Sequence, residues 1–160
     1  MSSSPSGRLR GNALVVSRRF RAPIEDVWKS ITDSDSTARW YGRWEGTPGP
    51  GNQIRVQMAF EDGAPWITKT IEICEPPRRL VLTADNKFVQ RLELVLAPTA
   101  EGCELELIHH DVNPAMVGDF GPGWEFYLDQ LVAARDAQPL PKFGDYYPSQ
   151  KAYYAALQPT

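Results

Sequence analysis

The sequence predicts an α+β domain in which a curved antiparallel sheet wraps around a long C-terminal helix, with two short helices after the first strand. Turn residues recur at short intervals between apolar runs in the middle of the chain, which is typical of antiparallel strands. Several of these runs alternate apolar and polar residues, so one face of the sheet must be buried. The long amphipathic segment left to cover that face is residues 121–136.

The composition is that of one globular domain. The 160 residues are 42% hydrophobic, enough for a single core that needs neither disulfides nor a structural metal. A formal net charge of −3 argues against nucleic-acid binding, because nucleic-acid-binding domains usually carry a concentrated basic face. No apolar run approaches the roughly 20 residues that a membrane-spanning helix needs. The sequence contains no motif for a cofactor, and we expect none.

The two cysteines and the chain ends complete the expected organisation. Cys74 and Cys103 lie in strand-like runs without metal-ligand spacing, so we expect reduced thiols, which favours a cytoplasmic protein. Residues 1–11 begin Ser-rich and lack the apolar stretch of a signal peptide, which predicts a disordered leader. The domain itself is expected over residues 12–138, followed by an aromatic tail over residues 139–160.

The first three elements follow from proline, capping residues and helical spacing. A strand is expected over residues 12–20, and it ends before Pro23 because a proline disfavours helical angles in the preceding residue. Pro23 then occupies the first turn of a helix in which apolar residues recur at helical spacing from Ile24 to Ile31. The run DSDST, residues 33–37, stops this helix and caps a short second helix through residues 38–41.

Five further strands are expected after a glycine-rich turn, because the apolar period changes from helical spacing to alternation. In the last of them Cys103, Leu105 and Leu107 face one way, and His109 continues that apolar side. The expected strands cover residues 54–60, 66–74, 80–83, 88–96 and 103–111.

The strand over residues 66–74 has two registers that fit the pattern equally well. In one register Lys69 faces inward with the neighbouring isoleucines; in the other Thr70, Glu72 and Cys74 face inward. A shift of one residue moves every side chain to the opposite face of the sheet. Lys69 is therefore either a solvated strand lysine or an amine directed into the core, where it would anchor an anion or act in catalysis.

The long helix is expected over residues 121–136. Trp124, Leu128 and Leu131 lie three or four residues apart and form its apolar face. The glycine-rich start, GPG, allows close approach to the sheet and places Trp124 at the mouth of the hollow beneath the helix.

Several local strings stand out along the chain: Phe20-Arg21-Ala22-Pro23, Val27-Trp28, Trp40-Tyr41, Glu75-Pro76-Pro77-Arg78-Arg79-Leu80, and Gly123-Trp124 with Leu128 and Leu131. These strings and the order of the elements resemble the START-like SRPBCC superfamily. Within it, the sequence is similar to single-domain relatives of the C-terminal domain of the heat-shock chaperone ATPase activator, over about residues 12–136. The resemblance implies a helix-grip fold with a cavity between the sheet and the last helix.

The tail departs from that resemblance, because such relatives usually end soon after the long helix. Residues 139–160 contain Phe143 and four tyrosines, and a packed aromatic ring buries on the order of 150–250 Å². We expect the tail to fold back on the domain, with residues 148–157 as a short helix, or to form a surface for a protein partner or a second copy of the chain.

The aromatic content favours a hollow core that binds a hydrophobic or amphipathic small molecule. A set of tryptophans supplies flat, rigid walls for an apolar ligand, and inward residues of the strands and the long helix complete the expected lining. That lining comprises Trp40, Trp44, Met58, Phe60, Trp66, Phe88, Leu92, Leu107, His109, Trp124, Tyr127, Leu128 and Leu131.

Two other functions remain open. One is an interaction module, resembling the chaperone activator, with a filled core and an exposed patch that includes tyrosines of the tail. The other is a cyclase-like or hydrolase-like enzyme in which His109 is the general acid or base, oriented by Asp111 or Tyr127. No metal site is expected, because adjacent strand residues such as His109 and His110 point to opposite faces.

Overall fold

The computed structural model describes residues 4–160. The strands of this range are β1 (Arg8–Arg10), β2 (Ala13–Phe20), β3 (Trp44–Gly46), β4 (Gln53–Gln57), β5 (Trp66–Glu75), β6 (Arg79–Thr83), β7 (Arg91–Thr99) and β8 (Gly102–His109). The helices are α1 (Ile24–Thr32), α2 (Ser34–Thr37), α3 (Val117–Arg135) and α4 (Lys151–Ala155), with single 3₁₀ turns at Pro114–Met116 and Phe143–Asp145.

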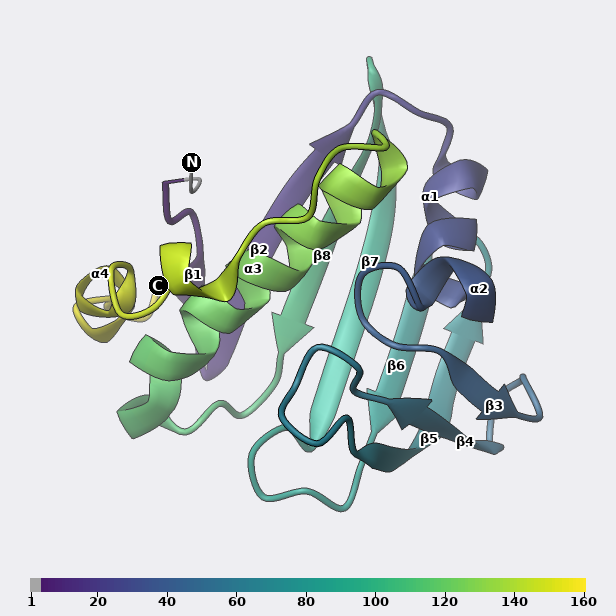
Figure 1. The fold of residues 1–160 in the computed structure, drawn as a ribbon, viewed down its shortest axis with the longest axis horizontal. Coiled ribbons are helices and arrows are strands. Elements are labelled where there is room, and N and C mark those ends of the chain that lie inside the picture. Colours follow the sequence, from purple (N-terminus) through teal and green to yellow (C-terminus); the bar gives the residue numbers. More distant parts are fainter. Residues whose placement is uncertain (1–3) are drawn as a thin grey trace.

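The strands form one antiparallel sheet, and α3 crosses one of its faces (Figure 1). Within the described residues the sheet has eight strands in the order β1-β2-β8-β7-β6-β5-β4-β3. In Figure 1, α1 and α2 lie beside α3, and α4 packs near its N-terminal half on the side of the chain termini. The predicted α+β helix-grip fold, with two short helices after the long N-terminal strand, is confirmed.

Part of the buried core lies where α3 meets the centre of the sheet. Leu105 and Leu107 of β8 pair with leucines of β7 on the inward face, as the alternation predicts. Leu128 and Leu131 of α3 belong to the same buried cluster. Each fully buried leucine contributes about 1.5–3 kcal/mol, so this half of α3 is firmly held on the sheet.

A β-bulge in β5 reconciles the two registers that the sequence left open. Pairing with β6 shifts between Ile71 and Ile73. Before the shift Lys69 and Ile71 are buried, and after it Cys74 is the residue that packs against the core. The extra residue of a bulge moves the following side chains to the other face. Both registers therefore occur, one in each half of the strand.

The short second helix begins earlier than predicted. The Asp33 side chain accepts a hydrogen bond from the backbone N–H of Ser36 at 3.1 Å, so the cap starts α2 at Ser34 rather than near residue 38. Strand β4 also ends at Gln57 instead of residue 60, and β7 begins at Arg91 instead of residue 88. In both cases the missing residues lie in loops at the same edge of the cavity described below.

Helix α3 also begins earlier than predicted, at Val117, so the GPG sequence lies inside the helix instead of starting it. Gly121 does not approach the sheet. A methyl group on its Cα would overlap the ring of Tyr154, which shows that this glycine makes room for α4. The preceding 3₁₀ turn is capped by Asn113, whose side chain accepts from the N–H of Ala115 at 3.0 Å.

The N-terminal segment is not a disordered leader over its full predicted length. Residues 8–10 pair with β2 as strand β1, and the Arg8 guanidinium lies 2.7 Å from Glu106. The backbone N–H of Gly7 donates to the Tyr154 hydroxyl at 3.1 Å. Backbone pairing and this contact order the segment; residues 1–3 of the expected leader lie outside the described residues.

The aromatic tail packs against the outer face of α3. Tyr146 and Tyr154 are almost fully buried, and their hydroxyls donate to Asp129 at 2.7 Å and to Glu125 at 2.6 Å. Burial raises the pKa of both tyrosines, and the neighbouring carboxylates raise it further. The expected tail helix is present as the short α4, Lys151–Ala155. Because this tail covers α3, the helix is buried on two faces rather than one.

Between residues 4 and 160, no helix is both long and apolar enough to cross a membrane. The same range contains no group of three or more histidine, cysteine or acidic side chains placed to hold a metal ion. Both cysteines are free thiols.

Candidate functional site

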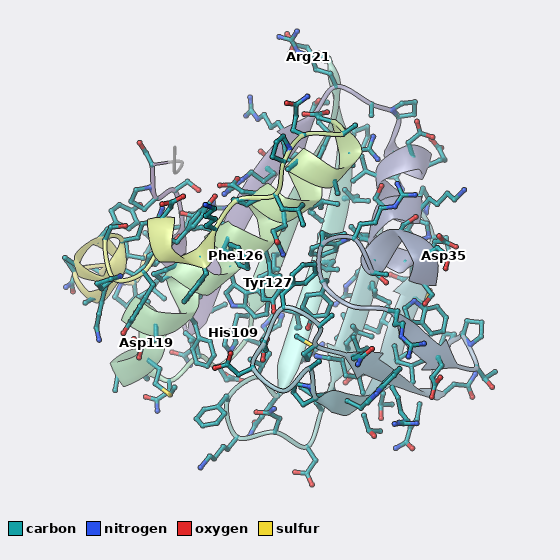
Figure 2. All side chains as sticks on the ribbon, viewed as in Figure 1. Arg21, Asp35, His109, Asp119, Phe126 and Tyr127 are labelled. Atoms are coloured by element: carbon teal, nitrogen blue, oxygen red, sulfur yellow. The ribbon has the colours of Figure 1, made fainter. Side chains whose placement is uncertain are left out.

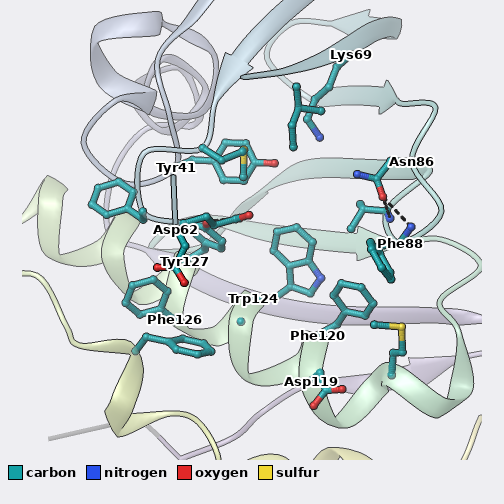
Figure 3. A pocket seen from close by; sticks show the side chains of 18 residues that line it. Tyr41, Asp62, Lys69, Asn86, Phe88, Asp119, Phe120, Trp124, Phe126 and Tyr127 are labelled. Atoms are coloured by element: carbon teal, nitrogen blue, oxygen red, sulfur yellow. Dashed lines mark hydrogen bonds between the residues drawn. The ribbon is translucent and has the colours of Figure 1, made fainter. Parts of the chain in front are cut away.

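A cavity of about 660 Å³ lies between the N-terminal half of α3 and the sheet (Figure 3). Its walls come from α3, strand β5, the loops that follow β4 and β6, and the tail. The lining residues are Tyr41, Met58, Phe60, Glu61, Asp62, Ile67, Lys69, Asn86, Phe88, Val89, Met116, Asp119, Phe120, Gly123, Trp124, Phe126, Tyr127 and Phe143.

The roof of the cavity is a row of aromatic side chains on α3. Phe120, Trp124 and Tyr127 are three or four residues apart, so they share one face of the helix. The rings of Trp124 and Tyr127 lie 6.0 Å apart, and Phe126 packs beside Tyr127 at 5.5 Å. In Figure 2, Phe126 and Tyr127 lie along α3, and His109 lies below them in the view. Rigid rings on a helix give the cavity a fixed apolar wall.

His109 holds Trp124 in place. The Trp124 indole Nε1 donates to His109 Nδ1 at 3.1 Å, and His109 Nε2 lies 3.1 Å from the carbonyl oxygen of Phe88. Since Nδ1 accepts, Nε2 must carry the proton and donate to that carbonyl. Burial lowers the pKa of His109 to about 4, so the ring is neutral near pH 7. The histidine is itself fully buried and connects the roof to the loop after β6.

Three exposed phenylalanines surround the cavity mouth, and we call them the rim. Phe60 is 37% exposed, and Phe88 and Phe143 are each 45% exposed, although all three line the cavity. Each belongs to a loop or to the 3₁₀ turn of the tail, and the Phe143 ring meets Phe126 edge to face at 5.5 Å. Large apolar side chains that stay exposed around a cavity are typical of a binding site.

Polar groups enter this apolar space at a few defined places. The Tyr127 hydroxyl donates to Glu61 at 2.8 Å, and burial raises the pKa of Tyr127 above its ordinary value. Lys69 is 5% exposed, and its Nζ lies 5.9 Å from the centre of the Tyr41 ring. Asn86 lies in the loop after β6, and Figure 3 shows it on the same side of the cavity as Lys69.

A second cavity of about 400 Å³ lies beneath α1 and α2, with Tyr41 on the wall of both cavities. Its walls are almost entirely apolar. The indoles of Trp40 and Trp44 line it, and their Nε1 groups donate to the carbonyls of Ser30 and Thr32 at 2.9 and 2.8 Å. These bonds leave only the apolar ring surface facing the cavity.

The structure separates the predicted lining into four groups. Trp66 lies on the face of β5 that points away from the cavity, because its neighbour Ile67 lines the cavity and adjacent strand residues alternate between faces. On that outer face, the guanidinium groups of Arg43 and Arg55 each lie 4.8 Å from the centre of the Trp66 ring. Met58, Phe60, Phe88, Trp124 and Tyr127 line the larger cavity; Trp40, Trp44, Leu92 and Leu107 line the smaller one; His109, Leu128 and Leu131 are buried in the core behind them.

The arrangement expected for acid–base catalysis by His109 is not present. Both ring nitrogens of His109 already bond to Trp124 and to the Phe88 carbonyl. Asp111 is exposed in a turn with φ of 49°, and the Tyr127 hydroxyl is directed to Glu61. Neither predicted partner orients the imidazole.

Several lining residues were not predicted from the sequence. Phe120 continues the helical spacing of Trp124 and Tyr127 one turn earlier, but the GPG sequence obscured the true start of α3. Tyr41, Asn86 and Phe143 come from connecting segments, where no periodic pattern marks them. Their positions depend on contacts between distant parts of the chain.

Comparisons with known proteins agree on the fold and the family. The solved structure of CalU16 from Micromonospora echinospora is 28% identical in sequence and superimposes with a TM-score of 0.76. The alignment covers 91% of this chain and 87% of the CalU16 chain. The protein encoded by gene BPP1335 of Bordetella parapertussis is 25% identical and has a TM-score of 0.73, and the alignment covers 100% of this chain and 95% of the Bordetella chain. The second of these alignments therefore includes the tail, residues 139–160. Among curated proteins no match was found.

The fold alone is shared with more distant structures, such as MLL2253 from Mesorhizobium loti, at 20% identity and a TM-score of 0.67 over 80% of this chain and 99% of its own. The family described as Activator of Hsp90 ATPase homolog 1-like protein matches residues 21–135, which is well over half of the sequence. The chain thus belongs to this family, within the START-like SRPBCC superfamily that its sequence resembles.

Proposed function

We propose that the protein binds a hydrophobic or amphipathic small molecule in the larger cavity, between α3 and the sheet. The observation that carries this proposal is the cavity of about 660 Å³ with an aromatic roof. Small-molecule sites typically measure about 300–1,000 Å³ and combine apolar walls with a small number of polar groups. This cavity has both properties.

The rigidity of the roof and the exposure of the rim support the same proposal. Trp124 is fixed by its bond to His109, so a planar wall exists before any ligand arrives. A preformed wall reduces the entropy that binding must remove. The exposed rim phenylalanines provide an apolar entrance to the cavity. Large apolar side chains are usually buried, so their exposure around the entrance supports a binding role.

The other two functions are less well supported. An interaction module with a filled core would leave no such cavity, and the tail tyrosines Tyr146 and Tyr154 are buried against α3 instead of forming an exposed patch. Catalysis by His109 would require a ring nitrogen open to substrate, and both of its nitrogens are occupied by partners within the protein.

Gly123 offers a direct test of binding. It lines the cavity, and a Cβ atom added to it would meet nothing within 4 Å. Gly123→Phe therefore introduces a ring at the cavity wall from a position where a Cβ atom meets no neighbour, whereas Gly123→Ala adds a single methyl group at the same site. We expect Nile red, a neutral apolar dye, to bind wild type and Gly123→Ala with enhanced fluorescence, and to bind Gly123→Phe at least tenfold more weakly.

Thermal unfolding monitored by circular dichroism checks that Gly123→Phe remains folded. Native mass spectrometry of the purified wild type should in addition detect any small molecule that co-purifies and that Gly123→Phe lacks. Equal Nile red binding by folded Gly123→Phe and Gly123→Ala would contradict the proposal, because the dye would then occupy another site.

A further inference from the structure

We infer that the ligand of the larger cavity is a monocarboxylic acid, with its apolar body beneath α3 and its carboxylate at Lys69. This inference rests on the proposed function and names the chemical class of the molecule that the cavity takes.

Lys69 is directed into the cavity by the strand that carries it. It precedes the bulge in β5, where the inward register holds, and it pairs with Ile54 of β4. Its side chain is 5% exposed and lines the cavity with Ile67, its inward neighbour on the same strand. Figure 3 shows Lys69 opposite the roof, with its amine pointing into the cavity.

No acidic side chain among residues 4–160 lies within 4 Å of the Lys69 amine to form an ion pair. Arg18, a half-buried cation, shows the usual arrangement, with Glu125 at 2.8 Å and Asp129 at 3.0 Å. Buried charges are normally paired, because removal of an ion from water is unfavourable. The ring of Tyr41 compensates only in part, since 5.9 Å is near the limit of a cation–π contact.

Asn86 adds hydrogen-bond donors on the same side of the cavity. Its side-chain oxygen accepts from the backbone N–H groups of Phe88 at 2.7 Å and Val89 at 3.3 Å. These two bonds fix the orientation of the amide, so its NH₂ group is the end that remains for a ligand. Figure 3 shows Asn86 and Lys69 both facing the cavity interior. An ammonium group and an amide NH₂ together suit a carboxylate.

The remaining charges of the cavity limit the ligand to a single negative charge. Glu61 and Asp62 are exposed at the mouth, and Glu61 is engaged by Tyr127 at 2.8 Å. Asp119 accepts from the Tyr147 hydroxyl at 2.8 Å on the outer side of α3. Three carboxylates in the cavity lining oppose entry of a multiply charged anion such as a phosphate ester. A monocarboxylate with a large apolar body satisfies both the amine and the aromatic roof.

Decanoate and decanol provide the test, because they share a chain and differ in charge. Their affinities are measured by displacement of Nile red at pH 7.5 from wild type, Lys69→Met and Lys69→Gln. We expect each Lys69 variant to bind decanoate at least tenfold more weakly, which corresponds to loss of one charge-assisted hydrogen bond. Decanol affinity should stay within about threefold of wild type, which also shows that the variants fold. Lys29→Met, which removes an exposed lysine of α1, should change neither affinity.

The outcomes separate this inference from the proposed function. Unchanged decanoate binding in both Lys69 variants, with binding still lost in Gly123→Phe, would overturn the carboxylate assignment and leave the cavity as the binding site. An equal loss of decanoate affinity in Lys29→Met would also overturn it, because a general effect of net charge would explain the result. Failure of wild type to bind Nile red, decanoate and decanol would overturn the proposed function itself.

Discussion

Two glycines on α3 should respond in opposite ways to the same substitution. Gly121 and Gly123 both lie inside the helix, two residues apart. A methyl group on Gly121 would overlap the Tyr154 ring, whereas a methyl group on Gly123 would meet nothing within 4 Å. We therefore predict that Gly123→Ala stabilises the protein and that Gly121→Ala destabilises it relative to Gly123→Ala.

The magnitude follows from two terms. Alanine in place of glycine in a helix interior gains about 0.8–1 kcal/mol, and both variants share this gain. Overpacking a well-filled site costs about 1–3 kcal/mol, and only Gly121→Ala bears this cost. Tyr154 cannot move away freely, because Gly7 lies against the other part of its ring and its hydroxyl donates to Glu125 at 2.6 Å. The two variants should thus differ by about 1–3 kcal/mol.

Urea unfolding followed by circular dichroism measures this difference directly. In a thermal scan it corresponds to roughly 2–12 °C, since about 1 kcal/mol shifts the midpoint of a domain of this size by about 2–4 °C. In a Tyr154→Ala background the overlap is absent, so Gly121→Ala should become stabilising, as Gly123→Ala is in wild type. Equal gains from the two glycine substitutions in wild type would refute the assignment of Gly121 as the contact point of the tail.

Two further predictions concern buried charge. Arg18→Met should lower the free energy of unfolding, measured in urea, by about 3–5 kcal/mol, because it leaves the fully buried Glu125 without its cation. As a control, Arg19→Met breaks the exposed contact with Glu104 and should change the free energy of unfolding by less than about 0.5 kcal/mol. Burial lowers the pKa of His109 from its ordinary value of 6.5 to about 4 in the folded protein. The unfolded chain therefore binds the extra proton between these values, and stability falls as pH drops from 6.5 to 4. His109→Gln should flatten this part of the urea-stability profile, which in wild type amounts to roughly 2–3 kcal/mol; an unchanged slope would show that the histidine is not the group responsible.

The sequence allowed the fold to be predicted where apolar spacing is local and strong. Alternation in β8 and helical spacing around Leu128 each depend on a few neighbouring residues, and both patterns appear in the structure as predicted. The two competing registers of β5 also have a physical explanation. Ile71 and Cys74 both pack against the core although they are three residues apart in a strand, which a β-bulge permits and a regular strand does not.

The candidate site could be predicted only in part, because several of its side chains come from outside the periodic elements. Trp124 and Tyr127 followed from the helix, but Tyr41 and Phe143 reach the cavity through a loop and through the tail. The inward position of Lys69 depends on where the bulge falls, and several positions in that strand would preserve the apolar pattern equally well. Tertiary contacts, and not local preference, decide these placements.

The tail explains how α3 remains in place above an open cavity. At Leu128 and Leu131 the helix packs on the buried core, whereas part of the inner face of its N-terminal half lines the larger cavity and has no side chain packed against it there. There the outer face supplies the missing support: the Glu125 carboxylate accepts hydrogen bonds from the side chains of Arg18 and Tyr154, and Gly121 lies against the Tyr154 ring. A roof fixed from outside can keep its inner face open for a ligand. Weakening that outer face should therefore lower the affinity of the cavity even though no lining residue has changed, because the ligand must then also order the helix that covers it.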